Sequence, residues 1–160
     1  PHGGCGDRRI KKGDIVVIDI GAKYQDYCAD LTRTLVIGQP SPRHVDLYNI
    51  VMFAQEIAMN SVKANVKANM VDAAARDLTN EKGYGKYFVH GLGHGVGLEI
   101  HEPPTLNPKS DEILSAGNVV TVEPGIYIPG FGGIRIEDTV LVREDGATKL
   151  TRAPYTLHTG

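Results

Sequence analysis

The sequence predicts an α+β fold, in which strands and helices are grouped along the chain and do not alternate. Strand patterns come first, two helix patterns occupy the middle, and further strand patterns follow. A parallel α/β sheet would require strands that alternate with helices. The length of 160 residues suits one domain, spanning residues 1–160, with a single core.

The first half of the chain holds two strand patterns and then two helix patterns. Residues 14–20 and 27–36 are runs rich in β-branched residues, which predict two strands of a hairpin. A capping serine and a proline at 41–42 predict a helix start, and apolar residues at helical spacing continue to Val62. A second helix is predicted over 70–82, because a glycine follows it directly.

Glycine occupies every second position from Gly91 to Gly97. So many glycines would destabilise a helix, so we expect extended backbone that other atoms approach closely. Beyond this stretch, short apolar runs separated by Gly- and Pro-containing turns predict strands at 118–123, 126–128, 134–142 and 148–150.

Composition and charge exclude several classes of protein. Lys and Arg total 17 against 19 Asp and Glu, a net charge of −2, so neither nucleic acid nor a membrane surface is expected as a partner. No run approaches the roughly 20 apolar residues of a spanning helix, and no signal-peptide pattern is visible. Two cysteines, Cys5 and Cys28, allow at most one disulfide, and a reduced, cytoplasmic chain is the simpler expectation.

Two acidic residues interrupt the first hairpin. Asp19 lies within an apolar run and Asp30 lies near the start of the second strand, although strand interiors disfavour aspartate. If the hairpin turns between Tyr24 and Gln25, positions that sum to 49 face each other, and the two carboxylates become cross-strand neighbours. Taken alone, each aspartate could equally be a turn cap or an edge-strand charge.

The second hairpin repeats this arrangement. A turn centred on Gly130 pairs positions that sum to 260, and this places Glu123 opposite Glu137. The alternative for Glu137 is a surface ion pair with Arg135. Four converging carboxylates and a histidine form an oxygen-rich ligand set for divalent metals, and two ions bridged by shared carboxylates balance the charge better than one.

The histidines divide into two groups. His94 is flanked by glycines that leave room for a metal or a substrate, and His90 falls on the same face if the stretch is extended. His101 precedes a Glu-Pro-Pro sequence that predicts a rigid loop. His44 and His158 fit solvated surface positions.

Five motifs occur in one order along the chain, and together they resemble a known family. The motifs are Asp19 in Ile-Asp-Ile-Gly, Asp30 in Ala-Asp-Leu-Thr-Arg-Thr, His94 in His-Gly-Leu-Gly-His-Gly-Val-Gly, Glu123 in Val-Glu-Pro-Gly-Ile-Tyr and Glu137 in Arg-Ile-Glu-Asp-Thr. They resemble the pita-bread metallopeptidases, which include methionine aminopeptidase, Xaa-Pro aminopeptidase, Xaa-Pro dipeptidase (prolidase) and creatinase. The resemblance implies a curved antiparallel sheet with two central helices.

The resemblance also implies roles for these residues. Asp19 would chelate one metal, Asp30 and Glu137 would bridge two, and His94 and Glu123 would complete the second site. Two divalent ions per chain are implied, with manganese or cobalt favoured and zinc or iron as alternatives.

Further residues match substrate-facing positions of this family. His90 and His101 match histidines beside the scissile bond, and His2 matches a substrate-facing histidine of the Xaa-Pro enzymes. Arg135 and Lys109 are candidates for binding a substrate carboxylate, although a packing residue and a surface charge are equally open interpretations.

The implied function is hydrolysis of the Xaa-Pro bond of dipeptides or peptide N-termini through a metal-bridging hydroxide. His101 would stabilise the oxyanion and Glu123 would transfer the proton, while His90 and His2 would contact the proline ring. The alternatives are a catalytically impaired domain that binds peptides or proteins, and a structural metal site. The sequence leaves dipeptidase and aminopeptidase activity undecided.

The family domain usually begins well before the first motif seen here. The expectation is therefore that residues 1–160 are the C-terminal part of a longer protein, which forms a homodimer at full length.

Overall fold

The computed structural model describes residues 1–3 and 6–159, and it has the predicted α+β architecture. A hairpin of β1 (Ile15–Tyr24) and β2 (Tyr27–Ile37) precedes α1 (Pro42–Ser61), α2 (Ala68–Glu81) and a short 3-10 turn (Gly85–Tyr87). The remaining strands are β3 (Gly93–Gly95), β4 (Glu102–Leu106), β5 (Val119–Val122), β6 (Gly125–Ile128), β7 (Gly132–Arg135), β8 (Asp138–Val142), β9 (Ala147–Lys149) and β10 (His158–Thr159).

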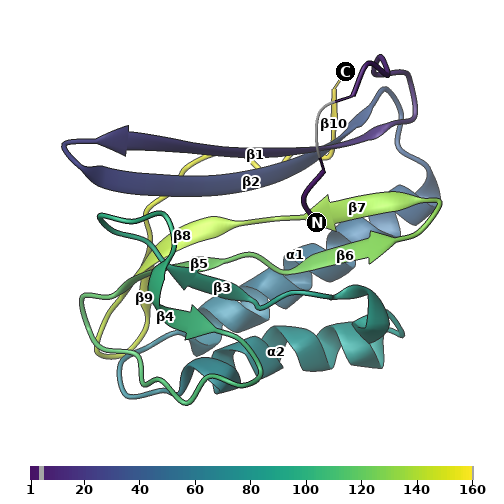
Figure 1. Cartoon of the computed structure of the whole chain (residues 1–160). Helices are drawn as coiled ribbons and strands as arrows, with labels where there is room; N and C mark the ends of the chain where they lie inside the picture. The colour runs from purple at the N-terminus through teal and green to yellow at the C-terminus, as the bar shows by residue number, and fades with distance from the viewer. Residues whose placement is uncertain (4–5, 160) are drawn as a thin grey trace.

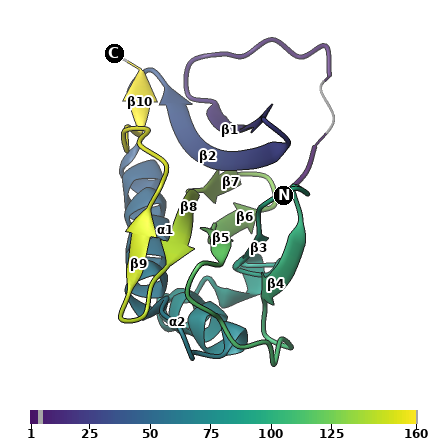
Figure 2. The same ribbon diagram turned by 90° about the vertical axis from the view of Figure 1, so that its left-hand side faces the viewer.

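The strands form three sheets. β1, β2 and β10 make the first sheet, β4-β3-β5-β8-β9 the second, and β6-β7 the third. All pairings are antiparallel except that of β10 with β2. Figure 1 shows the β1–β2 hairpin at one end of the molecule and α2 at the opposite end, with strands β3 to β9 between them. The view in Figure 2 shows the strong curvature of β2 over those strands.

The two helices begin differently. The Ser41 side chain accepts a hydrogen bond from the backbone N–H of His44, and the His44 ring returns one to the Ser41 N–H. This reciprocal capping satisfies two backbone donors at the start of α1. Lys67 precedes α2 without a side-chain cap, and the helix begins two residues earlier than predicted.

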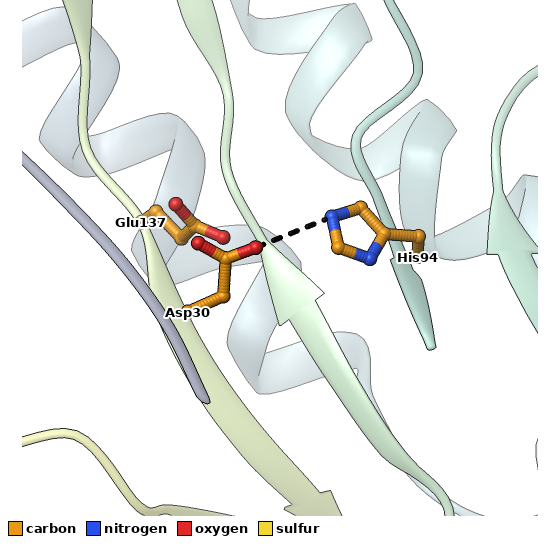
Figure 3. A group of neighbouring side chains, drawn as sticks. All are labelled: Asp30, His94 and Glu137. Carbon is orange, nitrogen blue, oxygen red and sulfur yellow. Dashed lines mark ion pairs between the residues drawn. The ribbon is translucent and has the colours of Figure 1, made fainter. Parts of the chain in front are cut away.

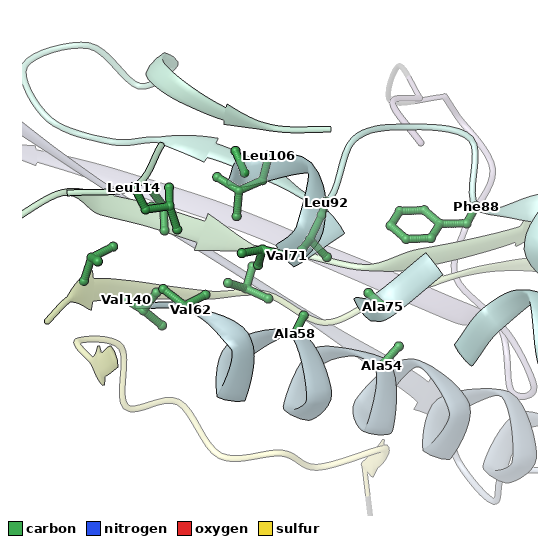
Figure 4. Packing of buried hydrophobic residues seen from close by; sticks show 14 residues of the cluster. Ala54, Ala58, Val62, Val71, Ala75, Phe88, Leu92, Leu106, Leu114 and Val140 are labelled. Carbon is green, nitrogen blue, oxygen red and sulfur yellow. The ribbon is translucent and has the colours of Figure 1, made fainter. Parts of the chain in front are cut away.

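The core is formed by the helices packing against the sheet. The larger cluster joins small residues of the two helices, such as Ala54, Ala58 and Ala75, to branched residues of β5 and β8 (Figure 4). Small side chains let the helices approach closely. Burial of apolar surface stabilises the packing by roughly 25 cal/mol per Å². A second cluster packs the first half of α1 against β6 and β7.

Several strands also differ from the prediction. The segment 134–142 is two strands, because β7 pairs with β6 whereas β8 pairs with β5 and β9. The Glu-Pro-Pro stretch expected as a loop is strand β4, and the short β10 was not predicted.

Two further points concern the cysteines and the membrane. Cys5 lies outside the described residues, so the structure does not test whether it forms a disulfide with Cys28. No helix in the described part of the chain combines the length and apolarity that crossing a membrane requires.

Candidate metal centre

Three of the predicted ligands meet at one point. Asp30 comes from β2, His94 from β3, and Glu137 from the link between β7 and β8. One ligand atom of each lies within 4.8 Å of the others. Figure 3 shows the two carboxylates side by side, with the His94 ring facing them and its Nε2 atom 3.7 Å from Oδ2 of Asp30.

Glu123 adjoins this group through His94. Its Oε1 atom lies 3.2 Å from Nε2 of His94 and accepts a hydrogen bond of 3.0 Å from the hydroxyl of Thr121. The same hydroxyl accepts the backbone N–H of His94 at 3.0 Å. Thr121 therefore fixes the histidine backbone and the glutamate side chain relative to each other.

The orientation of the His94 ring suits metal binding. Nδ1 donates to the carbonyl oxygen of Gly95 at 3.0 Å, so Nε2 is the atom that faces the carboxylates. A backbone acceptor on one ring nitrogen is a common way to present the other to a metal. A Cβ at Gly93 would lie 2.1 Å from the carbonyl oxygen of Thr121, and one at Gly95 would lie 2.5 Å from that of Glu102. The two flanking glycines therefore permit this close backbone packing.

The predicted register of the first hairpin is wrong, because the turn is centred one residue later than expected and each partner is shifted by two positions. Asp19 pairs with Thr32, and Asp30 pairs with Gly21, because the two-residue turn is Gln25-Asp26. Asp19 and Asp30 are thus diagonal neighbours on one face of the sheet. The Asp19 side chain is 43% exposed and binds Nη2 of Arg135 at 2.5 Å, and it is not one of the three closely grouped ligands.

The register of the second hairpin is confirmed. Pairs from Gly125↔Arg135 to Val119↔Leu141 all sum to 260, on both sides of Glu123 and Glu137. The two glutamates lie where one ladder ends and the next begins, next to Pro124, which has no N–H to donate.

Glu137 is the most informative residue for testing whether a cation fits. It is 1% exposed, and its Oε2 accepts the hydroxyl of Thr32 at 2.6 Å. Its Oε1 has no hydrogen-bond partner, although a buried carboxylate oxygen normally has one. The predicted alternative of an exposed ion pair with Arg135 is wrong, because both side chains are buried.

The electrostatics of the group also favour a positive charge at this point. Burial, reinforced by the charge of Glu123, raises the pKa of Glu137 to about 8. Burial and the charge of Asp19 likewise raise the pKa of Asp30. Burial opposes charge on His94 and on Glu123, but their mutual hydrogen bond, further hydrogen bonds and neighbouring charges together outweigh it, so the pKa of His94 is raised and that of Glu123 is lowered. An oxygen-rich group with one imidazole therefore fits a divalent metal.

A cleft of about 270 Å³ opens beside these residues, and it contains several predicted substrate-facing residues. His90, His94, Glu123 and Arg135 line it, together with the exposed His2. His101 is exposed and is not among the residues that line the cleft. Its ring lies edge-on to the ring of His94, and the two ring centroids are 4.3 Å apart.

Arg135 is a buried residue of the site and not a surface charge. It is 3% exposed and donates to Asp19, to Thr32 at 3.3 Å and to the hydroxyl of Tyr127 at 2.9 Å. The hydroxyl of Tyr127 in turn lies 3.0 Å from Nε2 of His90. Lys109, the other candidate for a substrate carboxylate, is exposed.

Sequence reasoning missed Thr32, Thr121 and Tyr127. One signal was available for Thr121, which lies two residues before Glu123 and so faces the same side of the strand. Thr32 is found only once the correct hairpin register is known.

Comparisons with known proteins identify the family. The model of metallopeptidase family M24 matches residues 1–144. The Xaa-Pro dipeptidase of Pyrococcus furiosus is 51% identical over 152 residues, which are 95% of this chain and 44% of that protein. The chain thus spans less than half the length of this curated relative.

Solved structures agree in fold. The prolidase from Pyrococcus furiosus superposes with a TM-score of 0.94 at 51% identity, covering 96% of this chain and 46% of that one. The X-Pro aminopeptidase from Thermotoga maritima superposes with a TM-score of 0.96 at 46% identity, covering 99% and 46%. These similarities confirm the pita-bread fold. The chain belongs to metallopeptidase family M24.

Proposed function

We propose that this chain carries the catalytic centre of a dinuclear, metal-dependent exopeptidase that hydrolyses Xaa-Pro bonds. The observation that carries the proposal is the approach of Asp30, His94 and Glu137 to within 4.8 Å at the edge of a cleft. Relatives named Xaa-Pro dipeptidase and X-Pro aminopeptidase support the substrate class. Proline-containing dipeptides or peptides are therefore the proposed substrates.

Asp30 and Glu137 would bridge two divalent ions, manganese or cobalt in the first place, with Asp19, His94 and Glu123 as the outer ligands. When bound, such a pair of ions makes hydroxide available near neutral pH and polarises the peptide carbonyl. Asp19 is held by Arg135 and Glu123 by Thr121, so both are oriented by hydrogen bonds from neighbouring side chains.

The remaining residues of the cleft would act on the substrate. Glu123 has an ionised carboxylate at neutral pH, so it can accept a proton from the attacking water and pass it to the proline nitrogen. That nitrogen has no N–H in the peptide, so it must gain this proton to leave. His101 would donate to the oxyanion, and His90 and His2 would contact the pyrrolidine ring.

The first experiment is hydrolysis of Ala-Pro and Ala-Pro-Ala with added manganese or cobalt. The test variant is Asp30→Asn, and the matched control is Asp26→Asn at the exposed turn of the same hairpin. Cleavage that is lost only in Asp30→Asn supports the proposal. The preferred peptide distinguishes a dipeptidase from an aminopeptidase.

The alternative, a domain that binds peptides without cleaving them, makes a different prediction. It requires peptide binding without hydrolysis and without bound metal. Such a result would overturn the catalytic proposal.

A further inference from the structure

Arg33 holds the backbone of the metal centre in place. It follows Thr32 on β2, and its Nη1 donates to the carbonyl oxygen of Thr32 at 2.9 Å and to that of Glu137 at 2.5 Å. Thr32 and Glu137 are also the two residues joined by the hydroxyl–carboxylate hydrogen bond. One guanidinium therefore fixes the main chain on both sides of that bond.

The C-terminal segment supplies the other partners of Arg33. Nε donates to the carbonyl oxygen of Pro154 at 3.2 Å, and Nη2 donates to that of Ala153 at 2.9 Å. The guanidinium lies 4.4 Å from the centroid of the Tyr155 ring. In Figure 2 this part of the chain runs beside α1 from β9 to β10, and it lies beyond residue 144, where the family match ends.

Asp138 closes the arrangement from β8. It is fully buried, and its Oδ1 accepts from Nη2 of Arg33 at 2.9 Å and from the hydroxyl of Thr151 at 2.6 Å. Its Oδ2 accepts from the amide of Gln55 at 3.0 Å and from the hydroxyl of Tyr155 at 2.5 Å. Asp138 directly follows Glu137, so these four donors also restrain the position of the metal ligand.

Stability alone does not explain such an arrangement. A buried ion pair loses hydration that its Coulombic attraction only partly returns, and apolar residues of similar volume often stabilise a protein as well or better. The contacts are instead directed at the backbone of one ligand and at the residue beside it. Partners of this kind set ligand orientation in metal sites.

We propose that Arg33, Asp138 and Tyr155 form a positioning unit for the metal centre, which makes the segment 151–157 necessary for its geometry. The proposal rests on the metal centre proposed above. None of the three side chains is proposed to bind the metal or the substrate. They act through Glu137 and Thr32.

The test measures Mn²⁺ affinity by titration calorimetry, and free Mn²⁺ by electron paramagnetic resonance, with no substrate present. Asp138→Asn is expected to weaken Mn²⁺ binding about 10–100-fold, as loss of such partners does in other metal sites. Tyr155→Phe keeps the ring over Arg33 and removes the hydrogen bond to Asp138, together with the one that the hydroxyl accepts from exposed Lys149, so it should weaken binding by a smaller factor. Val142→Ala, at a fully buried position of the same strand, is the control for lost stability and should leave Mn²⁺ affinity unchanged.

The outcomes separate the two proposals. Wild-type affinity in a folded Tyr155→Phe variant overturns the positioning unit, even if Asp138→Asn does not fold. Equal weakening in Val142→Ala also overturns it, because general destabilisation would then suffice. No Mn²⁺ binding by the wild-type chain overturns the metal centre itself, and the positioning unit with it.

Discussion

The hydroxyl of Thr32 donates to Oε2 of Glu137 at 2.6 Å, although 105 positions separate the two residues in the sequence. This bond leaves only Oε1 of the carboxylate without a partner. Thr32 thus occupies one oxygen of Glu137 and leaves the other available to a cation.

Thr32→Val tests this relationship. The substitution keeps the side-chain shape and removes the donor, so we expect Mn²⁺ affinity to fall roughly 10-fold or more and unfolding free energy to fall by about 1–3 kcal/mol. Calorimetric titration and urea unfolding measure the two effects. Thr32→Ser should restore affinity, whereas Thr79→Val on α2 should change stability only. Wild-type Mn²⁺ affinity in Thr32→Val would show that the bond does not orient the ligand.

The stability of the metal-free protein should fall as the pH rises. Burial and the charge of Glu123 raise the pKa of Glu137 to about 8, above the value of 4.5 expected in the unfolded chain. Between these two values the folded protein holds a proton that the unfolded chain has released. The stability that Glu137 contributes is therefore fully present below pH 4.5 and is lost as the pH rises through about 8.

Thermal unfolding in a chelating buffer between pH 5 and pH 8 measures this loss. Glu137→Gln carries no titrating group at this position, so its melting temperature should vary less over the same range. An identical pH dependence in the two proteins would assign the effect to other groups.

Metal should stabilise the folded chain by mass action. Mn²⁺ at 100 times its dissociation constant should add about 2.7 kcal/mol to the free energy of unfolding. Denaturant unfolding with and without Mn²⁺ provides the measurement, with Asp26→Asn responding like the wild type. If Mn²⁺ raised the free energy of unfolding of Asp30→Asn as much as that of the wild type, the ion would bind elsewhere.

Gly93→Ala should disrupt the backbone that carries His94. Its Cβ would lie 2.1 Å from the carbonyl oxygen of Thr121, so the strands must move apart. We expect a loss of about 1–3 kcal/mol in stability and weaker Mn²⁺ binding. Gly146→Ala is the matched control, because nothing lies within 4 Å of a Cβ there. Equal unfolding midpoints for the two variants would contradict this account.

The accuracy of the sequence prediction differs between the two hairpins for a physical reason. Gly130 has a φ of 75° and marks its turn clearly, so the register of Glu123 and Glu137 could be predicted. The first turn places Gln25 and Asp26 at φ values of 47° and 68°. Glutamine is not a residue that signals such a turn, so the predicted register was wrong.

The ligand motifs could be found in the sequence because each is a short local pattern. The contacts of Arg33 and Thr32 could not, because they depend on how β2 lies against β8 and on the path of the segment 151–157. The same holds for Arg135, whose burial is set by strands on both sides.

The three closely grouped ligands come from segments that are 64 and 43 positions apart in the chain, since they are residues 30, 94 and 137. Closing such long loops is costly in entropy, so sheets of this kind fold slowly. An ion held by all three can bind only after β2, β3 and the β7–β8 link have met. The ion is therefore expected to slow unfolding and to leave the folding rate almost unchanged, so that it prolongs the lifetime of the native state.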